Sequence, residues 1–94
     1  MLYTRESAEI LAIQCLGWLL SNEELLPVFM GATGVGEDDL RRNAGDPAFL
    51  IGVLDFVMLN DDWVLEFCAS AQVSNDAPMQ ARAMLPGGQE EHWT

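Results

Sequence analysis

The stretch that decides the fold is Phe49-Leu-Ile-Gly-Val-Leu-Asp-Phe-Val-Met-Leu59, eleven residues of which only Asp55 is charged. Asp46-Pro47 precedes it, and an aspartate followed by proline is a typical helix start, with the aspartate as cap and the proline at the first helical position. On a helical wheel only Gly52 and Asp55 interrupt the apolar surface. A helix that is apolar on nearly all sides must be buried on most of them. The segment is therefore predicted to be a central helix.

A second run of the same length, Ile10–Leu20, has the same character. Its polar strip consists of Gln14, Gly17 and Ser21. Neither run reaches the roughly 18 apolar residues that a membrane span needs, so both are predicted to lie inside a domain without membrane contact. Two such helices are difficult to enclose in a chain of 94 residues. Either the shorter helices wrap them fully, or part of their surface is a protein–protein interface.

Capping residues divide the rest of the chain into further helices, and no segment alternates as a strand would. The predicted helices run from Thr4 to about Ser21, from Asn22 to Thr33-Gly34, from Glu37 to Gly45, from Asp46 to about Leu59, from Asn60 to about Ala71, and from Asp76 to Pro86-Gly87-Gly88. We therefore expect an all-α fold, a compact bundle of five to six helices. It forms a single domain over residues 1–88, followed by a mobile tail, residues 89–94.

The chain also resembles itself at an offset of 38 residues without a gap. Caps and apolar positions stay in phase across three elements, the clearest pairs being Leu16 with Leu54, Trp18 with Phe56, Asn22 with Asn60, and Phe29 with Phe67. Identities are few, so chance is the alternative explanation. A true duplication predicts two three-helix halves that face each other across a pseudo-twofold axis.

The charge is strongly one-sided. Fifteen carboxylates face four arginines with no lysine, which gives a formal net charge of −11. Such a surface repels nucleic acid and anionic lipid and attracts basic proteins, although a merely solvated surface has the same composition. Cys15 and Cys68 each lie inside an apolar run, where a free cysteine behaves as a small hydrophobic residue. Two such residues do not form a disulfide framework, so a cytoplasmic setting is expected.

Several segments together carry a resemblance to a known family. They are Leu11-Ala-Ile-Gln-Cys-Leu-Gly-Trp-Leu19, Phe29-Met-Gly-Ala-Thr-Gly34, Asp39-Leu-Arg41, Asp46-Pro-Ala-Phe-Leu50 and Val53-Leu-Asp-Phe56. Over roughly residues 8 to 88 the chain resembles a small alphaproteobacterial family of unknown function. The resemblance implies a small cytoplasmic bacterial protein. It carries no known activity, so no functional residue is transferred from it.

The chain lacks the usual components of a catalytic or cofactor site. Its single histidine, His92, lies in the predicted tail, where it cannot be held against a nucleophile. The absence of lysine excludes a phosphate-binding P-loop and a Schiff base. The acidic runs Glu37-Asp38-Asp39 and Asn60-Asp61-Asp62 lack the ligand spacing of a calcium loop and suit helix starts. We therefore expect no catalytic residue, no metal and no cofactor.

Five residues remain as candidates for a polar or interaction site. Asp55 lies inside an apolar helix and needs a partner if it is buried, and Arg41 or Arg42 is the expected one. Trp63 is a candidate contact residue, as is Trp93, because tryptophan is enriched at binding hot spots. A structural ion pair at Asp55 and ordinary half-burial of Trp63 are the simpler interpretations, and Trp18 is expected in the core.

These observations leave three functional hypotheses. The first is a non-enzymatic protein-interaction module that binds a partner or forms a homodimer through its apolar helices. The second is an acidic adaptor or inhibitor that docks on a basic partner protein. The third is a small-molecule site around Asp55. None of them involves nucleic acid or a membrane.

Overall fold

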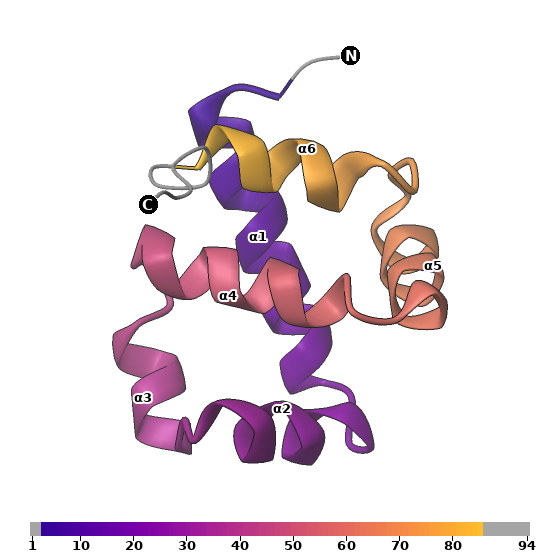
Figure 1. Ribbon diagram of the computed structural model, residues 1–94. Helices are drawn as coiled ribbons and strands as arrows, with labels where there is room; N and C mark the ends of the chain where they lie inside the picture. Colours follow the sequence, from indigo (N-terminus) through magenta and orange to yellow (C-terminus); the bar gives the residue numbers. More distant parts are fainter. Residues whose placement is uncertain (1–2, 86–94) are drawn as a thin grey trace.

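The computed structural model describes residues 3–85, and in this range the chain folds into six α-helices and no strand (Figure 1). The all-α bundle expected from the sequence is confirmed. The helices are α1 (Arg5–Leu20), α2 (Leu25–Thr33), α3 (Glu37–Arg42), α4 (Pro47–Val57), α5 (Asp61–Ala71) and α6 (Ala77–Met84). None of these helices is long and apolar enough to cross a membrane. The Pro86-Gly87-Gly88 stop and the predicted tail lie outside the described residues.

The helix starts follow from side chains that accept orphan backbone N–H groups. The Thr4 hydroxyl accepts the Ser7 N–H at 3.1 Å, and the Asp46 carboxylate accepts the Ala48 N–H at 3.2 Å. One predicted terminus is wrong. We expected Gly45 to end the third helix, but α3 ends at Arg42 and Asn43 caps it without a left-handed residue. The short polar helix stops early, and residues 43–45 form a turn that leads into α4.

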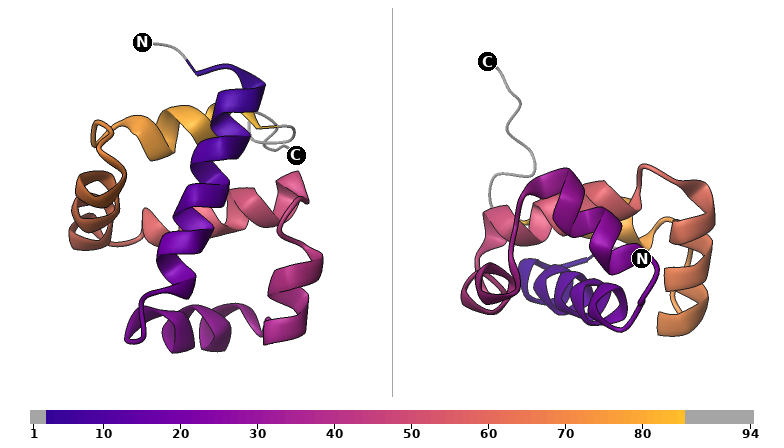
Figure 2. Two further views of the ribbon diagram at one scale, coloured as in Figure 1. Left: turned by 180° about the vertical axis from the view of Figure 1, so that it is seen from behind. Right: turned by 90° about the horizontal axis from the view of Figure 1, so that it is seen from below.

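The two apolar helices, α1 and α4, cross at the centre of the molecule. Figure 2 shows α1 running across α4 and α6, on the opposite side of the bundle from most of the other helices. The core is one cluster, and Leu50, Val53 and Leu54 of α4 are fully buried in it. The central role predicted for the quoted stretch is confirmed, since α4 packs on both α1 and α6.

The two apolar helices differ in how far they are enclosed. Within α1, three large apolar side chains remain exposed: Ile10 at 58%, Ile13 at 48% and Leu20 at 45%. They lie on one face with Gly17, because positions three and seven apart share a helix face. No α4 residue is among the exposed large apolar side chains of the described range. Of the two apolar helices, α1 is therefore the one that keeps an exposed apolar face.

The offset of 38 residues recurs in the local geometry of the two halves. The Oδ1 of Asn22 accepts the N–H groups of Glu24 and Leu25 at 3.1 and 3.0 Å. Asn60, 38 positions later, accepts the N–H groups two and three residues on, at 2.8 and 3.4 Å. The two left-handed residues of the described range, Gly34 and Gln72, are also 38 apart and close α2 and α5. We call two residues with this separation equivalent.

Aromatic contacts between the halves are reciprocal. Trp18 of the first half meets Phe67 of the second with ring centroids 5.8 Å apart and an edge-to-face angle of 62°. Their equivalents, Phe56 and Phe29, meet at 5.1 Å and 74°. Exchange of the halves maps one contact onto the other, as a pseudo-twofold axis predicts. The correspondence is incomplete, because α6 packs extensively on α1 while α3 does not pack comparably on α4. The duplication itself stays a prediction.

Candidate functional site

Asp55, the first candidate residue, is paired with Arg82. The guanidinium of Arg82 binds the Asp55 carboxylate through both Nε and NH2, the latter at 3.2 Å from Oδ2. The expectation that Arg41 or Arg42 would be the partner is wrong. The crossing of α4 by α6 brings together two residues 27 positions apart, which the sequence did not indicate. The Asp55 side chain is 47% exposed, so this is a half-buried structural ion pair.

The two arginines of α3 lie elsewhere. Arg42 binds Asp39 on the same helix at 2.5 Å, and this contact and the N–H of Gly36 lower the pKa of the Asp39 carboxyl, the Gly36 hydrogen bond being the stronger cause. Arg41 lines a small hollow of about 200 Å³ with Glu37, over a floor of leucines from three helices, Leu20, Leu26 and Leu40. The structure therefore does not gather the predicted polar residues into one site.

Trp63, the fourth candidate, is half-buried rather than free. Its ring stacks on that of Phe56 with centroids 5.0 Å apart and an interplanar angle of 26°. It also lines a hollow of about 250 Å³ between α2 and α5, with Glu24 and Glu66 at the rim. It stacks on a ring that is itself buried, since Phe56 is only 6% exposed. Trp93 and His92 lie outside the described residues.

The reactive groups of the described range are poorly suited to chemistry. Cys15 and Cys68 are free and fully buried. Burial raises the pKa of the Cys15 thiol to about 12, and the charge of Cys68 adds to this rise. Burial also raises the pKa of Cys68. A thiol that stays protonated is a poor nucleophile and metal ligand. Within residues 3–85 no three His, Cys, Asp or Glu side chains are grouped to hold a metal.

The most developed hollow lies at Trp18, a residue that we expected in the core. Two adjoining hollows, of about 400 and 390 Å³, share Trp18 and Ser21 in their linings. We call them together the Trp18 groove, lined by Gln14, Gly17, Trp18, Ser21, Asn22, Glu23, Glu24, Phe67, Ser70 and Ala71. The groove runs between the second half of α1, the α1–α2 turn and α5. It is open to solvent along its length.

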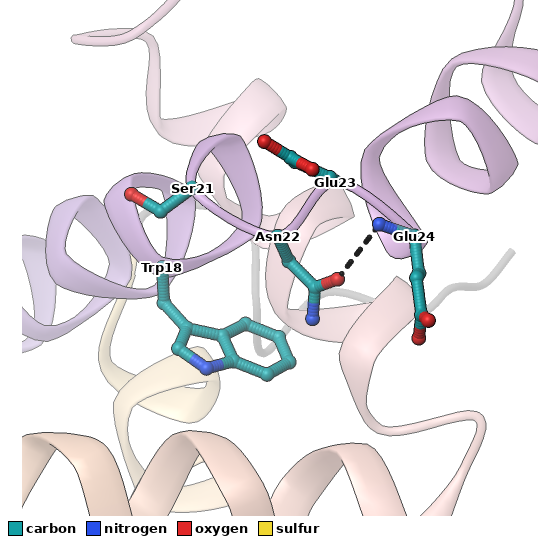
Figure 3. Close-up of a pocket in the computed structure, with 5 residues that line it drawn as sticks. All are labelled: Trp18, Ser21, Asn22, Glu23 and Glu24. Carbon is teal, nitrogen blue, oxygen red and sulfur yellow. Dashed lines mark hydrogen bonds between the residues drawn. The ribbon is translucent and has the colours of Figure 1, made fainter.

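The floor of this groove is aromatic and its position is fixed by packing. The half-buried indole of Trp18 rests against the buried ring of Phe67. The turn above it is held by the two hydrogen bonds of Asn22, one of which is drawn in Figure 3. In this view the indole and the side chain of Glu24 extend to the same side of the turn, and Glu23 extends to the other. The site is therefore preorganised by α1, α5 and a capped turn.

The rim of the Trp18 groove is acidic. Glu23 and Glu24 are exposed, and no arginine is among the lining residues. Glu24 also lines the neighbouring hollow, which adds Glu66 from α5. Carboxylates beside an aromatic surface of low dielectric constant create a local negative potential. The arrangement suits a cation with an apolar or planar body.

The two halves differ in what covers the aromatic floor. In the second half Phe56, the equivalent of Trp18, is covered by Trp63. The equivalent of Trp63 in the first half is Leu25, a smaller side chain that is itself buried at 5% exposure. Leu25 has no ring to stack on the indole, so Trp18 keeps an open face. The sequence already shows Leu25 and Trp63 at an offset of 38 residues. This difference points to the groove only when the arrangement of the two halves is also given.

Comparison with known proteins adds a family and no activity. Searches of curated proteins and of solved structures give no match. A family model described as "Protein of unknown function (DUF3572)" matches residues 5–88, nearly the whole chain and all six helices. This agrees with the resemblance to a family of unknown function seen in the sequence. The chain therefore belongs to the DUF3572 family.

Proposed function

We propose that the protein is a non-enzymatic interaction module that binds a basic segment of a partner protein in the Trp18 groove. One observation carries the proposal: the half-buried indole of Trp18 lies beside Glu23 and Glu24 in a groove without a lining cation. Tryptophan in a hollow is a favoured anchor at interfaces. Carboxylates at the rim select a positively charged partner and speed its approach.

The overall charge supports the same type of partner. A net charge of −11 raises the local concentration of cationic proteins and repels nucleic acid. Binding is therefore expected to weaken as salt screens exposed charges. A cytoplasmic location belongs to the proposal, because two buried free thiols are typical of a reducing compartment.

The test uses synthetic amphipathic helical peptides with leucines on one face and either basic, neutral or acidic residues on the other. Each peptide carries a fluorescent label, and binding to the full chain is measured by fluorescence anisotropy at low and physiological salt. The basic peptide is expected to bind, with an affinity that falls as salt rises, and the acidic peptide is not. Equal binding of the basic and neutral peptides would overturn the proposal.

Two matched variants on α5 locate the binding. Ser70 lines the groove and Ala69 does not, although both are exposed. Ser70→Arg is expected to weaken the basic peptide on the order of tenfold, because it places a cation inside the groove. Ala69→Arg changes the net charge equally and is expected to have a much smaller effect. If both variants weaken binding alike, only the general surface charge is acting and the groove is not the site.

Self-association through α1 is a second candidate function, supported by the exposed Ile10, Ile13 and Leu20 on one helix face. The charge opposes it, because two copies bring equal negative charges together. A dimer of this kind is therefore expected to strengthen with added salt, and Ile13→Gln is expected to weaken it. Sedimentation velocity measures both effects. A protein that stays monomeric at high concentration and high salt removes this candidate.

We do not extend the proposal to a small-molecule site at Asp55. Its carboxylate is held by Arg82, and none of the four hollows described here has Asp55 in its lining. The ion pair accounts for an acidic residue in an apolar helix.

A further inference from the structure

The covered half of the molecule indicates what kind of group closes the open half. Trp63 lies over Phe56 with nearly parallel rings, 5.0 Å apart at 26°. A flat group therefore fits on this face of the aromatic floor. Trp18 is the equivalent of Phe56 and has no such cover, because Leu25 stands where the second half has Trp63. By the pseudo-twofold relation, a flat group from outside the chain fits above Trp18.

The charge of the rim indicates which flat group this is. The carboxylates of Glu23 and Glu24 in the lining favour a cation over a neutral group. The guanidinium of arginine is flat, stacks on indole as a cation, and donates paired hydrogen bonds to carboxylates. Lysine supplies the charge but has no flat group. Trp18 and Glu24 line the same hollow, and Glu24 extends to the same side of the turn as the indole (Figure 3).

None of the chain's own arginines lines the groove. Arg82 binds Asp55 on α4, Arg42 binds Asp39 within α3, and Arg41 lines the hollow on α3. Arg5 begins α1, thirteen residues before Trp18, which corresponds to about 20 Å along a helix. The chain has no other arginine and no lysine. The cation must therefore come from another molecule.

We propose that the Trp18 groove is an arginine-selective subsite, in which the partner's guanidinium stacks on the Trp18 indole and pairs with Glu24. This inference rests on the proposed function, because it specifies one side chain of the basic partner. It makes Trp18 the residue that distinguishes arginine from lysine. Glu24 then distinguishes a charged flat group from a neutral one.

The test uses three versions of the basic peptide, with arginine, lysine or citrulline at every charged position. Citrulline keeps the flat shape of arginine without its charge. The arginine peptide is expected to bind about three- to tenfold more tightly than the lysine peptide, and the citrulline peptide is expected to bind weakly. In a background with Trp63→Phe and Trp93→Phe, the arginine peptide is expected to perturb the indole N–H resonance of Trp18 in an NMR spectrum.

Variants separate this inference from the proposed function. Trp18→Leu is expected to remove the preference for arginine while both basic peptides still bind through the acidic rim. Glu24→Gln, at an exposed position, is expected to reduce the advantage of arginine over citrulline and keeps the test valid if Trp18→Leu fails to fold. If the arginine and lysine peptides bind the native chain equally, the subsite is overturned and the proposed function stands. If neither binds, the proposed function itself is overturned.

Discussion

The two buried thiols make the stability of this protein depend on pH in the alkaline range. Burial raises the pKa of the Cys15 thiol from 9.0 to about 12. Between these values the unfolded chain loses the thiol proton and the folded chain keeps it. The folded state therefore loses stability as the pH rises above about 9, by about 1.4 kcal/mol per pH unit for one proton. Below that pH the contribution does not change.

The size of the effect follows from the same values. The full rise in pKa corresponds to about 4 kcal/mol, which is reached only near pH 12. At pH 11 we expect a loss of about 3 kcal/mol relative to pH 8 from Cys15. Cys68 adds to the loss, because burial raises its pKa as well. A loss of this size is a large part of the stability of a small domain.

The assay is urea denaturation followed by circular dichroism between about pH 8 and pH 11, with a reducing agent present. The chain is favourable for it, because it contains no lysine. Cys15→Ala is the matched variant. It loses some packing at every pH, but its free energy of unfolding is expected to fall less steeply with pH than that of the native chain. Parallel curves for the two proteins would refute the reasoning.

Three further predictions concern the asparagine caps, the left-handed residue at the end of α5 and the ion pair of Asp55. Asn22→Ala and Asn60→Ala each remove an acceptor of two backbone N–H groups. Each is therefore expected to lower the free energy of unfolding by about 1 kcal/mol, measured by urea denaturation. No loss for either variant would contradict the capping role. Gln72→Gly is expected to stabilise the protein by about 1 kcal/mol and raise its melting temperature, because Gln72 has a φ of 60° where the equivalent residue is Gly34; a lower melting temperature would count against this. Arg82→Leu breaks a half-exposed ion pair and is expected to cost about 1 kcal/mol or less, with a smaller difference at high salt; a salt-independent loss would indicate packing instead.

The sequence was sufficient for the parts of the fold that depend on local chemistry. Caps such as Thr4, Asp46 and Asn60 use their own side chains within three residues, so their effect is visible in the sequence. Gly34 ends α2 for an equally local reason. Gly45 misled the prediction, because a glycine after a charged helix resembles a terminator even where the chain has already turned at Asn43.

The candidate site depends on contacts between distant residues, which sequence patterns do not specify. The predicted partner of Asp55 was wrong. The crossing of α6 over α4 brings Arg82 to Asp55, and neither arginine of α3 pairs with this carboxylate. Trp18 was expected in the core because it lies in an apolar run. It rests instead on Phe67 of α5 and lines a hollow. The sequence shows the residue types at these positions, and the contact between them comes from the packing of α1 on α5.

The departure from symmetry is the strongest physical reason to look for function at Trp18. If both halves served only stability, each aromatic floor would gain from a covering ring, since stacked pairs contribute about 0.5–1.5 kcal/mol beyond burial. The second half has that cover in Trp63, whereas the half-buried indole of Trp18 lines an open hollow. An exposed aromatic surface is a cost in the free chain and a gain in a complex. The half that is left open is therefore the half that we expect to meet a partner.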